Sequence, residues 1–545
     1  MCLPASCDLK DVRTILEMSS DIATSALSGG NSRNLTILAL KSPDLDDYKY
    51  WRDPTFIILA VVGSLVGLLM ALGSAYDLRL RRQLRPLQFA VQQHCQHCKQ
   101  TQNGAIALDV ISVPNKKQAA TVVAVKECNG NHAIDSYGSA ELSLEEKTYE
   151  EKSNKEESSW LQYGRAFLLC FSVPQNARAI FDQSVGGDTL STLHGLRFLS
   201  MVWVILGHSC IVAFKYADNT NFRGVVEREF LFQTISNAAF SVDTFFFISG
   251  LLFSFLYFRT AAKVDLNVIT RATGLKSKFL QMIGLLAYRF GRLTSPYLFV
   301  LGAVQISMKW FHHKSVFDPP TLDHENCPKY WWRNALYINT LFPVKDMCML
   351  WSWYLADDTQ FYVLGAILMI LALSHFRTAA GLFVTFMVSS WFTTAYIAFT
   401  NNHQPSVDDP LALFDKIYDK PWTRLGPYLV GMGTGWLLYN IDCKLKLNRG
   451  GVALGWSVCA ATLLSLLYGL YDARLDAVSS AAYSSLSHSA WALGTAWIVV
   501  ACSPVRKILS APILYPLSRV TYCAYLVHPM VIRTMVISES ETINL

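Results

Sequence analysis

Two polar side chains with catalytic potential share one face of an otherwise apolar stretch. Arg197 and His208 are eleven positions apart, and their neighbours are mainly Leu, Val, Met and Trp. At about 100° and 1.5 Å per residue, a helix places both side chains on one face, about 16 Å apart along its axis. A neutral imidazole in such a stretch can act as a general base. A structural histidine that hydrogen-bonds a neighbouring helix explains the pattern equally well.

A second candidate lies in the aromatic stretch 240–250. It contains Asp243 and Ser249 among phenylalanines and ends at Gly250, which permits close approach of two helices. Ionisable residues inside a membrane span are costly and usually mark function. For Asp243, however, packing at the outer end of a helix is slightly favoured over a functional role.

A third candidate is the acidic pair at the start of the stretch 353–374. Asp357, Asp358 and Gln360 follow one another closely there. Acids suit the positive end of the helix dipole, so a hydrated helix N-terminus explains Asp357 well and Asp358 less well.

The fourth candidate is His528, in the middle of the stretch 511–533. Tyr522 and Tyr525 precede it by one to two helical turns. His528 and Tyr522 are candidates for lining a pocket, although a lone histidine at such a position is more often structural.

One histidine- and cysteine-containing segment could suggest a metal site. His94, Cys95, His97 and Cys98 are followed, about thirty residues later, by Cys128 and His132. Zinc sites use CxxC pairs, but the second half is CxxxH, which is not a usual partner. We therefore expect no metal, and favour lipidated or unreactive thiols.

The elements that must position these side chains are membrane helices. Hydrophobic residues make up 52% of the 545 residues and charged residues only 16%, against about 25% charge in soluble domains. A bilayer core needs about 20 apolar residues as helix, and lipid excludes open strands. The sequence predicts an all-α polytopic membrane protein, a bundle of about ten spans: 56–76, 196–216, 234–258, 293–311, 353–374, 379–399, 425–440, 452–471, 487–502 and 511–533.

The distribution of basic residues predicts the orientation of these spans. Arg79, Arg81, Arg82 and Arg85 follow the first span, and further Lys and Arg residues gather in the loops 259–292, 441–450 and 503–510. Positive loops stay in the cytosol, so the N-terminus lies outside, as do the loops 312–352, 400–424 and 472–486. The basic residues are spread over short loops, so the net charge of +6 indicates topology and no nucleic-acid partner.

The segments outside the bundle differ in character. Residues 1–55 are polar and form an outer segment, with Asn34 in a glycosylation sequon and Cys2 and Cys7 near its start. Residues 77–190 contain no span and are rich in Glu, Lys and Ser near their middle, which predicts a cytosolic, partly disordered loop. The transmembrane domain then occupies 191–545. These features suggest a protein of the secretory system or the plasma membrane.

Two cysteines fall in the first outer loop of the bundle. Cys327 and Cys348 lie on the side that we expect to be oxidising, where a disulfide between them can form. The cysteines in the spans and in the cytosolic segments are expected to be free thiols.

Taken together, these motifs resemble the integral-membrane acyltransferase family 3, and most closely its animal branch, the "nose resistant to fluoxetine" proteins. The family's Arg-x10-His motif is similar to Arg197 and His208. Further family patterns resemble 241–250, 289–297, 353–362, 420–428 and 517–529, with Ser295 replacing a proline and Asp357 replacing an asparagine. The resemblance covers roughly 185–535.

The resemblance implies transfer of an acyl group from cytosolic acyl-CoA, as co-substrate, to an acceptor at or across the membrane. The acceptor would be a membrane lipid, a sugar or a small molecule. His208 would take the acceptor's proton, and Asp358 would orient His208 or the acceptor. Arg197, Arg289 and Arg292 would bind the phosphates of the donor, because guanidinium groups offer paired donors. No phosphate loop or nucleophile elbow is evident, so direct transfer is favoured over a covalent intermediate.

The resemblance also implies that the chain is incomplete. Residues 1–55 resemble the end of a cysteine-rich outer domain, so we expect Met1 to be internal to a longer chain. The family carries one further span after the His-Pro helix, which this sequence does not contain.

A non-catalytic protein for lipid or small-molecule transport, built on the same bundle, is the alternative. A transporter should show polar residues in two vestibules and paired broken helices. An acyltransferase should gather its polar residues around one cytosol-facing pocket. The sequence shows no clear inverted repeat, so the acyltransferase is favoured.

Overall fold

The long helices of the chain carry nearly all of its candidate site residues. A computed structural model describes residues 10–11, 13–15, 18, 48–100, 159–183, 190–217, 219–315, 317–405, 413–445, 447–471, 473, 475–501 and 506–538. Over these ranges the secondary structure is helical throughout, without a strand. The long helices are α2 (Pro54–Gln100), α6 (Thr192–Lys215), α9 (Ala239–Lys263), α11 (Gly274–Lys314), α13 (Trp353–Ser374), α14 (Phe376–Thr400), α15 (Pro421–Asn440), α16 (Arg449–Tyr468), α17 (Ala477–Ala501) and α20 (Thr521–Ile537).

Short helices fill the connections between the long ones. The α-helices among them are α4 (Ser159–Leu169), α5 (Val173–Phe181), α7 (Thr220–Glu227), α8 (Gln233–Ser236), α10 (Leu266–Thr270), α12 (Asp323–Ala335), α18 (Arg506–Leu509) and α19 (Leu514–Arg519). Tighter turns are η1 (Tyr50–Arg52), η2 (Phe230–Phe232), η3 (Asn339–Leu341), η4 (Val344–Asp346), η5 (Leu350–Ser352) and the π-helical η6 (Phe414–Tyr418).

Each of the ten predicted spans falls largely within one of the long helices. Within the described ranges, six helical segments are long and apolar enough to cross a membrane: they lie in α2, α6, α9, η5 with α13, α14 and α16. The other four predicted spans correspond to α11, α15, α17 and α20. The chain is therefore an all-α polytopic membrane protein, as predicted from its apolar runs.

Two helices extend well beyond their predicted spans. The first span was expected to end at residue 76, yet α2 continues to Gln100, and a pair between Arg81 and Asp77 at 2.8 Å joins successive turns of this extension. The predicted inner loop 259–292 is also largely helical, because α11 starts at Gly274 and passes through Pro296 without ending. Helix formation outside the bilayer needs no apolar run, which is why hydropathy missed both extensions.

The chain divides into two compact units, residues 1–59 with 183–545 and residues 60–182. In the smaller unit, Ser172 caps α5 and its hydroxyl donates to Asp77 at 2.8 Å. In the larger unit, the start of α2 is held by α11. Lys309 pairs with Asp53 at 2.7 Å, and Gln305 donates to Thr55 at 3.0 Å.

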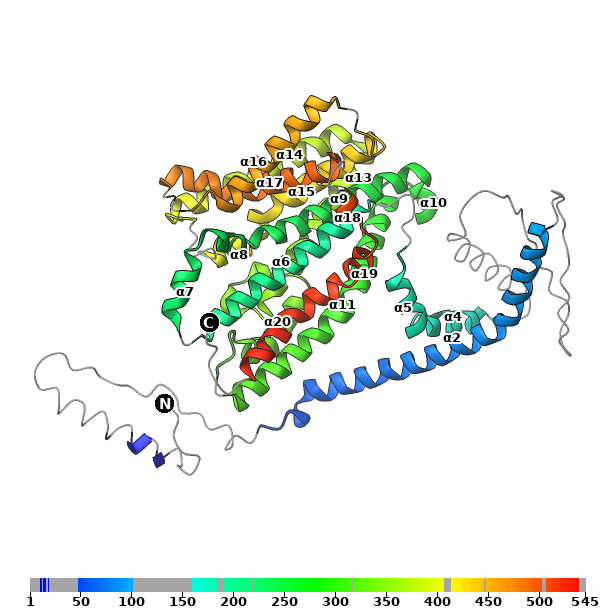
Figure 1. The fold of residues 1–545 in the computed structure, drawn as a ribbon, viewed down its shortest axis with the longest axis horizontal. Coiled ribbons are helices and arrows are strands. Elements are labelled where there is room, and N and C mark those ends of the chain that lie inside the picture. Colours follow the sequence, from blue (N-terminus) through cyan, green and yellow to red (C-terminus); the bar gives the residue numbers. More distant parts are fainter. Residues whose placement is uncertain are drawn as a thin grey trace, which may run out of the picture. The chain divides into compact units, whose positions relative to one another are not determined.

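The helices of the larger unit form two packed groups. In Figure 1, α6, α9, α11 and α20 run side by side, and the contacts of α6 with α9 and α20, and of α11 with α20, agree with this view. Helices α14, α15, α16 and α17 form the second group. The most extensive contact of all, between α9 and α15, joins the two groups.

Glycines permit this contact between α9 and α15. A Cβ atom added to Gly250 would lie 2.2 Å from the carbonyl oxygen of Tyr428. One added to Gly431 would lie 2.1 Å from the oxygen of Phe247. One added to Gly435 would lie 2.4 Å from the oxygen of Leu251. These three residues, the glycine seam, bring two backbones into direct contact, as small residues do in membrane helix pairs.

Candidate functional site

Helices α6 and α20 bring two histidines into contact. Nδ1 of His208, on α6, lies 2.7 Å from Nε2 of His528, on α20. The two rings are nearly parallel, at 13°, with centroids 5.0 Å apart. His528 is buried, whereas His208 is half-buried and its Nε2 has no hydrogen-bond partner among the described residues. The arrangement can present one imidazole nitrogen as a proton acceptor.

A second cluster, the arginine–aspartate cluster, consists of Arg197, Arg289, Arg292 and Asp358. Arg289 forms an ion pair with Asp358, and its guanidinium carbon lies 4.4 Å from the centre of the Tyr362 ring. Arg197 lies within electrostatic range of Asp358 and Arg292, and Arg292 is exposed. The structure thus brings together all three arginines and the aspartate that the sequence singled out.

The roles expected within this cluster change in one respect. Asp358 was expected to orient His208 or the acceptor, but it pairs with Arg289, and the hydrogen-bond partner of His208 is His528. Its second oxygen, the Nε of Arg289 and the hydroxyl of Tyr428 are buried without a hydrogen-bond partner among the described residues. Buried polar groups normally have a hydrogen-bond partner, so these three groups are suited to binding a polar ligand.

Asp243 belongs to a third cluster, which sequence reasoning did not assemble. Its carboxylate lies 3.2 Å from Nη1 of Arg424 on α15 and 2.7 Å from Nδ1 of His488 on α17. Arg424 and Asp243 are fully buried, and the Arg424 guanidinium also lies 4.6 Å from the centre of the Tyr418 ring. Asp243 therefore neutralises a buried arginine and is more than a packing residue at a helix end.

Arg424 and His488 were the residues missing from this cluster. Arg424 lies within the motif 420–428, and His488 lies just inside the predicted span 487–502. The signal that singled out Asp243, an ionisable residue within an apolar run, applied to His488, whereas Arg424 was placed at the end of the outer loop 400–424. Only the pairing of three separate helices gives them a role.

Other candidates bind the scaffold. Gln360 donates to the carbonyl of Tyr337 at 2.9 Å and to Thr340 at 3.0 Å. Tyr522 donates to the carbonyl of Leu293 at 2.8 Å, while Ser249 is half-buried in α9. These contacts fix connections between elements.

Asp357 differs from its sequence interpretation. A hydrated helix N-terminus was expected to explain it, yet its side chain is fully buried. Thr340, in the polypeptide before α13, lies next to it, and so do Asp419, Lys420 and Arg424 near the start of α15.

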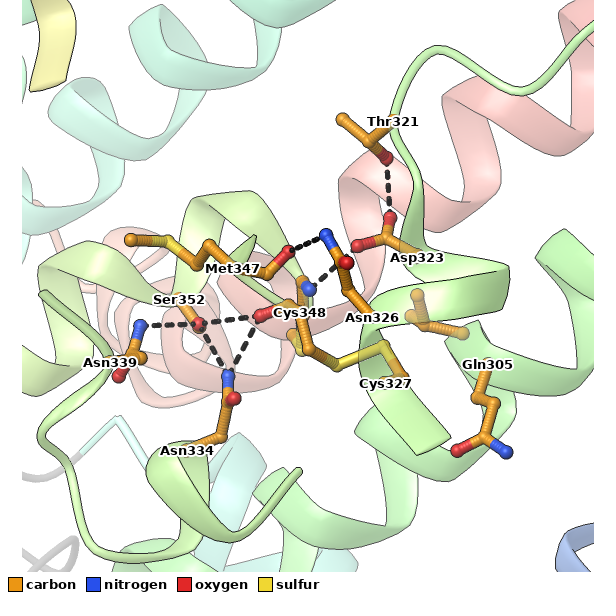
Figure 2. The surroundings of a disulfide bond; sticks show 12 residues. Gln305, Thr321, Asp323, Asn326, Cys327, Asn334, Asn339, Met347, Cys348 and Ser352 are labelled. Atoms are coloured by element: carbon orange, nitrogen blue, oxygen red, sulfur yellow. Dashed lines mark hydrogen bonds between the residues drawn. A yellow bond between two sulfur atoms is a disulfide. The ribbon is translucent and has the colours of Figure 1, made fainter. Parts of the chain in front are cut away.

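That polypeptide, residues 317–352, is the stapled loop. A disulfide joins its Cys327 and Cys348. Figure 2 shows Asn334 pointing at the segment that contains Cys348 and Ser352. The amide of Asn334 donates to the carbonyl of Cys348 at 2.8 Å and to Ser352 at 2.9 Å. The staple therefore fixes the chain that leads directly into α13.

The stapled loop also holds α20, the helix of His528. The hydroxyl of Tyr525 donates to the carbonyl of Trp351 at 2.6 Å, and the Trp351 indole donates to the carbonyl of Leu526 at 3.3 Å. Arg533 pairs with Asp323 at 3.0 Å. His528 is thus positioned from two sides, by α6 and by this loop.

Two cavities adjoin the bundle. The larger, of about 590 Å³, lies between α9, α10, α11 and α13, and its lining includes Lys263, Lys278 and Gln281. The smaller, of about 100 Å³, reaches His488 and Tyr418 of the third cluster. The lining of the larger cavity also includes Asp265, and Lys278 donates to the hydroxyl of Ser374 at 2.9 Å.

The remaining sequence predictions concern metal and modification sites. In the part of the chain that the structure describes, no three His, Cys, Asp or Glu residues are grouped to hold a metal ion. The segment 94–98 lies in α2, where only the backbone is described, whereas Cys128 and His132 lie outside the described residues. So do Asn34, Cys2 and Cys7.

Comparison with known proteins adds to this geometry. The sequence model of a protein family described as "Acyltransferase domain" matches residues 190–536, which include all three clusters. The chain is 28% identical over 407 residues to "Nose resistant to fluoxetine protein 6" of Caenorhabditis elegans. This match covers 69% of the chain and 49% of that protein, so the chain spans about half the length of this curated relative. No solved structure matches the chain.

Proposed function

Because the chain belongs to the acyltransferase family that matches residues 190–536, we propose that it transfers an acyl group from acyl-CoA to a hydroxyl or amine acceptor at the membrane. The observation that carries the proposal is the His208–His528 pair, which leaves Nε2 of His208 without a partner among the described residues, on a half-buried helix face. General base catalysis of this kind contributes about 10²–10⁴ to a rate.

The transfer needs three events at one place. The acceptor oxygen or nitrogen loses its proton to Nε2 of His208 as its lone pair attacks the thioester carbonyl. The carbon–sulfur bond then breaks, and the CoA thiolate takes up the proton. Electrostatic stabilisation of the developing negative charge is usually a large part of such catalysis. Arg197 lies about 16 Å along α6 from His208, so we assign the arginines to binding of the donor phosphates and not to this charge.

The donor is acyl-CoA, whose phosphates require positive charge. Lys263 and Lys278 line the cavity of about 590 Å³ between the end of α9 and the start of α11, together with Asp265. Residues 278 and 289 are eleven positions apart on α11, a rise of about 16 Å. We propose that the nucleotide part of the donor binds at this cavity and that its arm extends along α11 toward Arg292 and Arg289.

The acceptor belongs to the membrane or its surface: a lipid, a sugar or a small molecule. We propose that the N-terminal segment lies outside, in the secretory system or at the plasma membrane, and that residues 77–190 lie in the cytosol. The basic end of α11 then faces the cytosolic donor, in agreement with the charge of the loop 259–292.

The experiment that tests this function is acyl-CoA turnover by the purified chain in detergent. Several acyl chains are supplied with a lipid extract as acceptor, and release of free CoA thiol is measured. We expect release by the wild type, loss in His208→Ala, and wild-type rates in the control His313→Ala, which changes a half-buried histidine at the opposite end of α11 from the cavity.

Two outcomes would contradict the proposal. Wild-type rates in His208→Ala would remove the base from the mechanism. Absence of CoA release by the wild type with every donor would favour the transport function instead, and uptake of a labelled lipid into vesicles containing the protein would then be the activity to measure.

A further inference from the structure

A continuous line of hydrogen bonds runs from the backbone of α20 to the ring of His208. Nδ1 of His528 lies 3.0 Å from the carbonyl oxygen of Ala524, one turn earlier on the same helix. Nε2 of His528 lies 2.7 Å from Nδ1 of His208. Two hydrogen bonds therefore connect the Ala524 carbonyl, the His528 ring and the His208 ring, and the donor of each bond can be assigned.

The carbonyl oxygen decides both directions, because it can only accept. Nδ1 of His528 must carry a proton to bond it, and a neutral imidazole carries one proton only. Nε2 of His528 is then a lone pair that accepts from Nδ1 of His208. His208 in turn carries its proton on Nδ1, which leaves the lone pair on its Nε2.

We propose that His528 is a positioning residue that holds His208 in the tautomer with the proton on Nδ1, so that Nε2 is the base. The inference rests on the proposed transfer reaction for its catalytic meaning, but the tautomer itself is a property of the resting protein. It gives the His-Pro position of α20 a role that does not require contact with the substrate.

A neutral partner suits this location. The charged group facing the pair is Arg533 on α20, which lies within electrostatic range of His208 and is itself paired with Asp323. A carboxylate in place of His528 would add a buried charge, which carries a desolvation penalty of several kcal/mol. A histidine orients the base without that penalty.

The pair also has a defined part in the reaction. When Nε2 of His208 takes the acceptor's proton, the Nδ1–H bond to His528 becomes charge-assisted, and such bonds are shorter and stronger. His528 stays neutral throughout, and the proton leaves from Nε2 of His208 to the thiolate of the departing CoA. No oxidant, metal or further reactant is involved.

Contacts on α20 keep His528 in place for this role. Tyr525 donates to the Trp351 carbonyl at 2.6 Å and Trp351 donates to the Leu526 carbonyl at 3.3 Å, so the turn before His528 is tied to the stapled loop. The near-parallel rings limit rotation of both imidazoles.

The test uses two substitutions of His528 that differ in one property. His528→Gln keeps an acceptor oxygen near the place of Nε2, whereas His528→Phe keeps the ring and removes the acceptor. We expect kcat to fall on the order of 10² in His528→Phe, and by no more than it falls when the base His208 is removed. KM should change little. His528→Gln should recover most of that loss.

A second readout does not depend on activity. Nitrogen-15 NMR of histidine-labelled protein, with His208 identified by subtraction of the His208→Ala spectrum, reports which ring nitrogen is protonated. We expect a protonated Nδ1 and a bare Nε2 in the wild type and in His528→Gln, but not in His528→Phe.

The two readouts separate this inference from the proposed function. A wild type without transfer activity, but with the Nδ1–H tautomer at His208, would contradict the proposed function and still support the proposed pairing with His528. A wild type whose His208 carries its proton on Nε2, or a His528→Phe variant that retains kcat and tautomer, would overturn the inference. Thermal unfolding of each variant, together with the Gln rescue, separates loss of positioning from loss of folding.

Discussion

At the scale of single residues, three largely buried arginines are each paired with an aspartate. Arg289 pairs with Asp358, Arg424 with Asp243, and Arg533 with Asp323. Removing one member of a buried pair leaves an uncompensated charge, which usually destabilises by about 3–5 kcal/mol. These pairs therefore restrict which substitutions the bundle tolerates.

The Arg289–Asp358 pair gives the first prediction. Asp358→Asn should lower the free energy of unfolding by about 3 kcal/mol, because the half-buried guanidinium loses its carboxylate. Adding Arg289→Gln should restore part of that loss. Unfolding in a mixed detergent series measures both variants.

The exposed pair of Lys444 and Asp442, with side chains 76% and 88% exposed, provides the control. Asp442→Asn there should change stability by less than about 1 kcal/mol. Equal losses for the two substitutions would contradict a special role for burial.

A second prediction concerns pH and the buried Asp419, in the connection before α15. Burial raises its pKa to about 6, despite the opposing effect of Lys420 at 3.2 Å. The folded protein thus holds a proton that the unfolded chain, with its pKa of 3.8, releases earlier. Stability contributed by this group is full below about pH 4 and is lost as pH rises to 6.

Comparison of the wild type with Asp419→Asn tests this sign. The difference in unfolding midpoint between the two proteins should grow between pH 4 and 6 in favour of the variant, which cannot ionise. A difference that stays constant with pH would show that Asp419 does not titrate in that range.

The sequence predicted individual residues better than their partners. Arg197 and His208 could be placed on one face because they share a helix. His208 and His528 are 320 positions apart, and no spacing rule connects separate helices. The same limit explains why Asp243 was singled out without Arg424 and His488, and why Asp358 was assigned to His208 instead of Arg289.

At the scale of helices, apolar length predicted the elements and glycine decides how they pack. Each predicted span overlaps a long helix, although 511–533 is divided between α19 and α20. The extension of α11 from Gly274 mixes basic with apolar residues and was read as a loop. Gly250 was expected to allow close approach, and it does so against α15. Its partner glycines on α15 were not identified, because a glycine pattern does not reveal its facing helix.

The glycine seam provides a third prediction. Gly431→Ala places a methyl group 2.1 Å from the oxygen of Phe247, so α9 and α15 must separate, at a cost of about 1–3 kcal/mol. Gly433→Ala is the matched control on the same helix, because its Cβ would lie 3.6 Å from the Phe383 ring, an ordinary contact. Thermal unfolding should distinguish the two variants, and equal midpoints would contradict the seam.

At the scale of the whole molecule, the stapled loop connects α13 to α20 and so to the histidine pair. Cys327 and Cys348 close a segment with a separation of 21 residues. A disulfide around a loop of this length contributes about 3 kcal/mol, largely by restricting the unfolded chain. The loop was placed by charge and hydropathy, but its grip on α20 follows only from Trp351, Tyr525 and Arg533 in three dimensions.

Removal of the disulfide is the fourth prediction. The double variant Cys327→Ser with Cys348→Ser should unfold at a lower temperature than the wild type, and its CoA release should fall with loosening of His528. The double variant Cys170→Ser with Cys443→Ser changes two exposed thiols and should match the wild type. Detection of free thiols at Cys327 and Cys348 in the unreduced protein would contradict the staple.

The glycine seam has a mechanical consequence. A carrier that opens alternately to the two sides of a membrane must rock one group of helices against another. At the glycine seam, the backbones of α9 and α15 are in direct contact, and no side chains lie between them over which the helices could slide. Helices α9 and α15 therefore hold the two helix groups together by direct backbone contact. Any movement of one group against the other has to occur at interfaces where side chains separate the helices, such as that between α6 and α20.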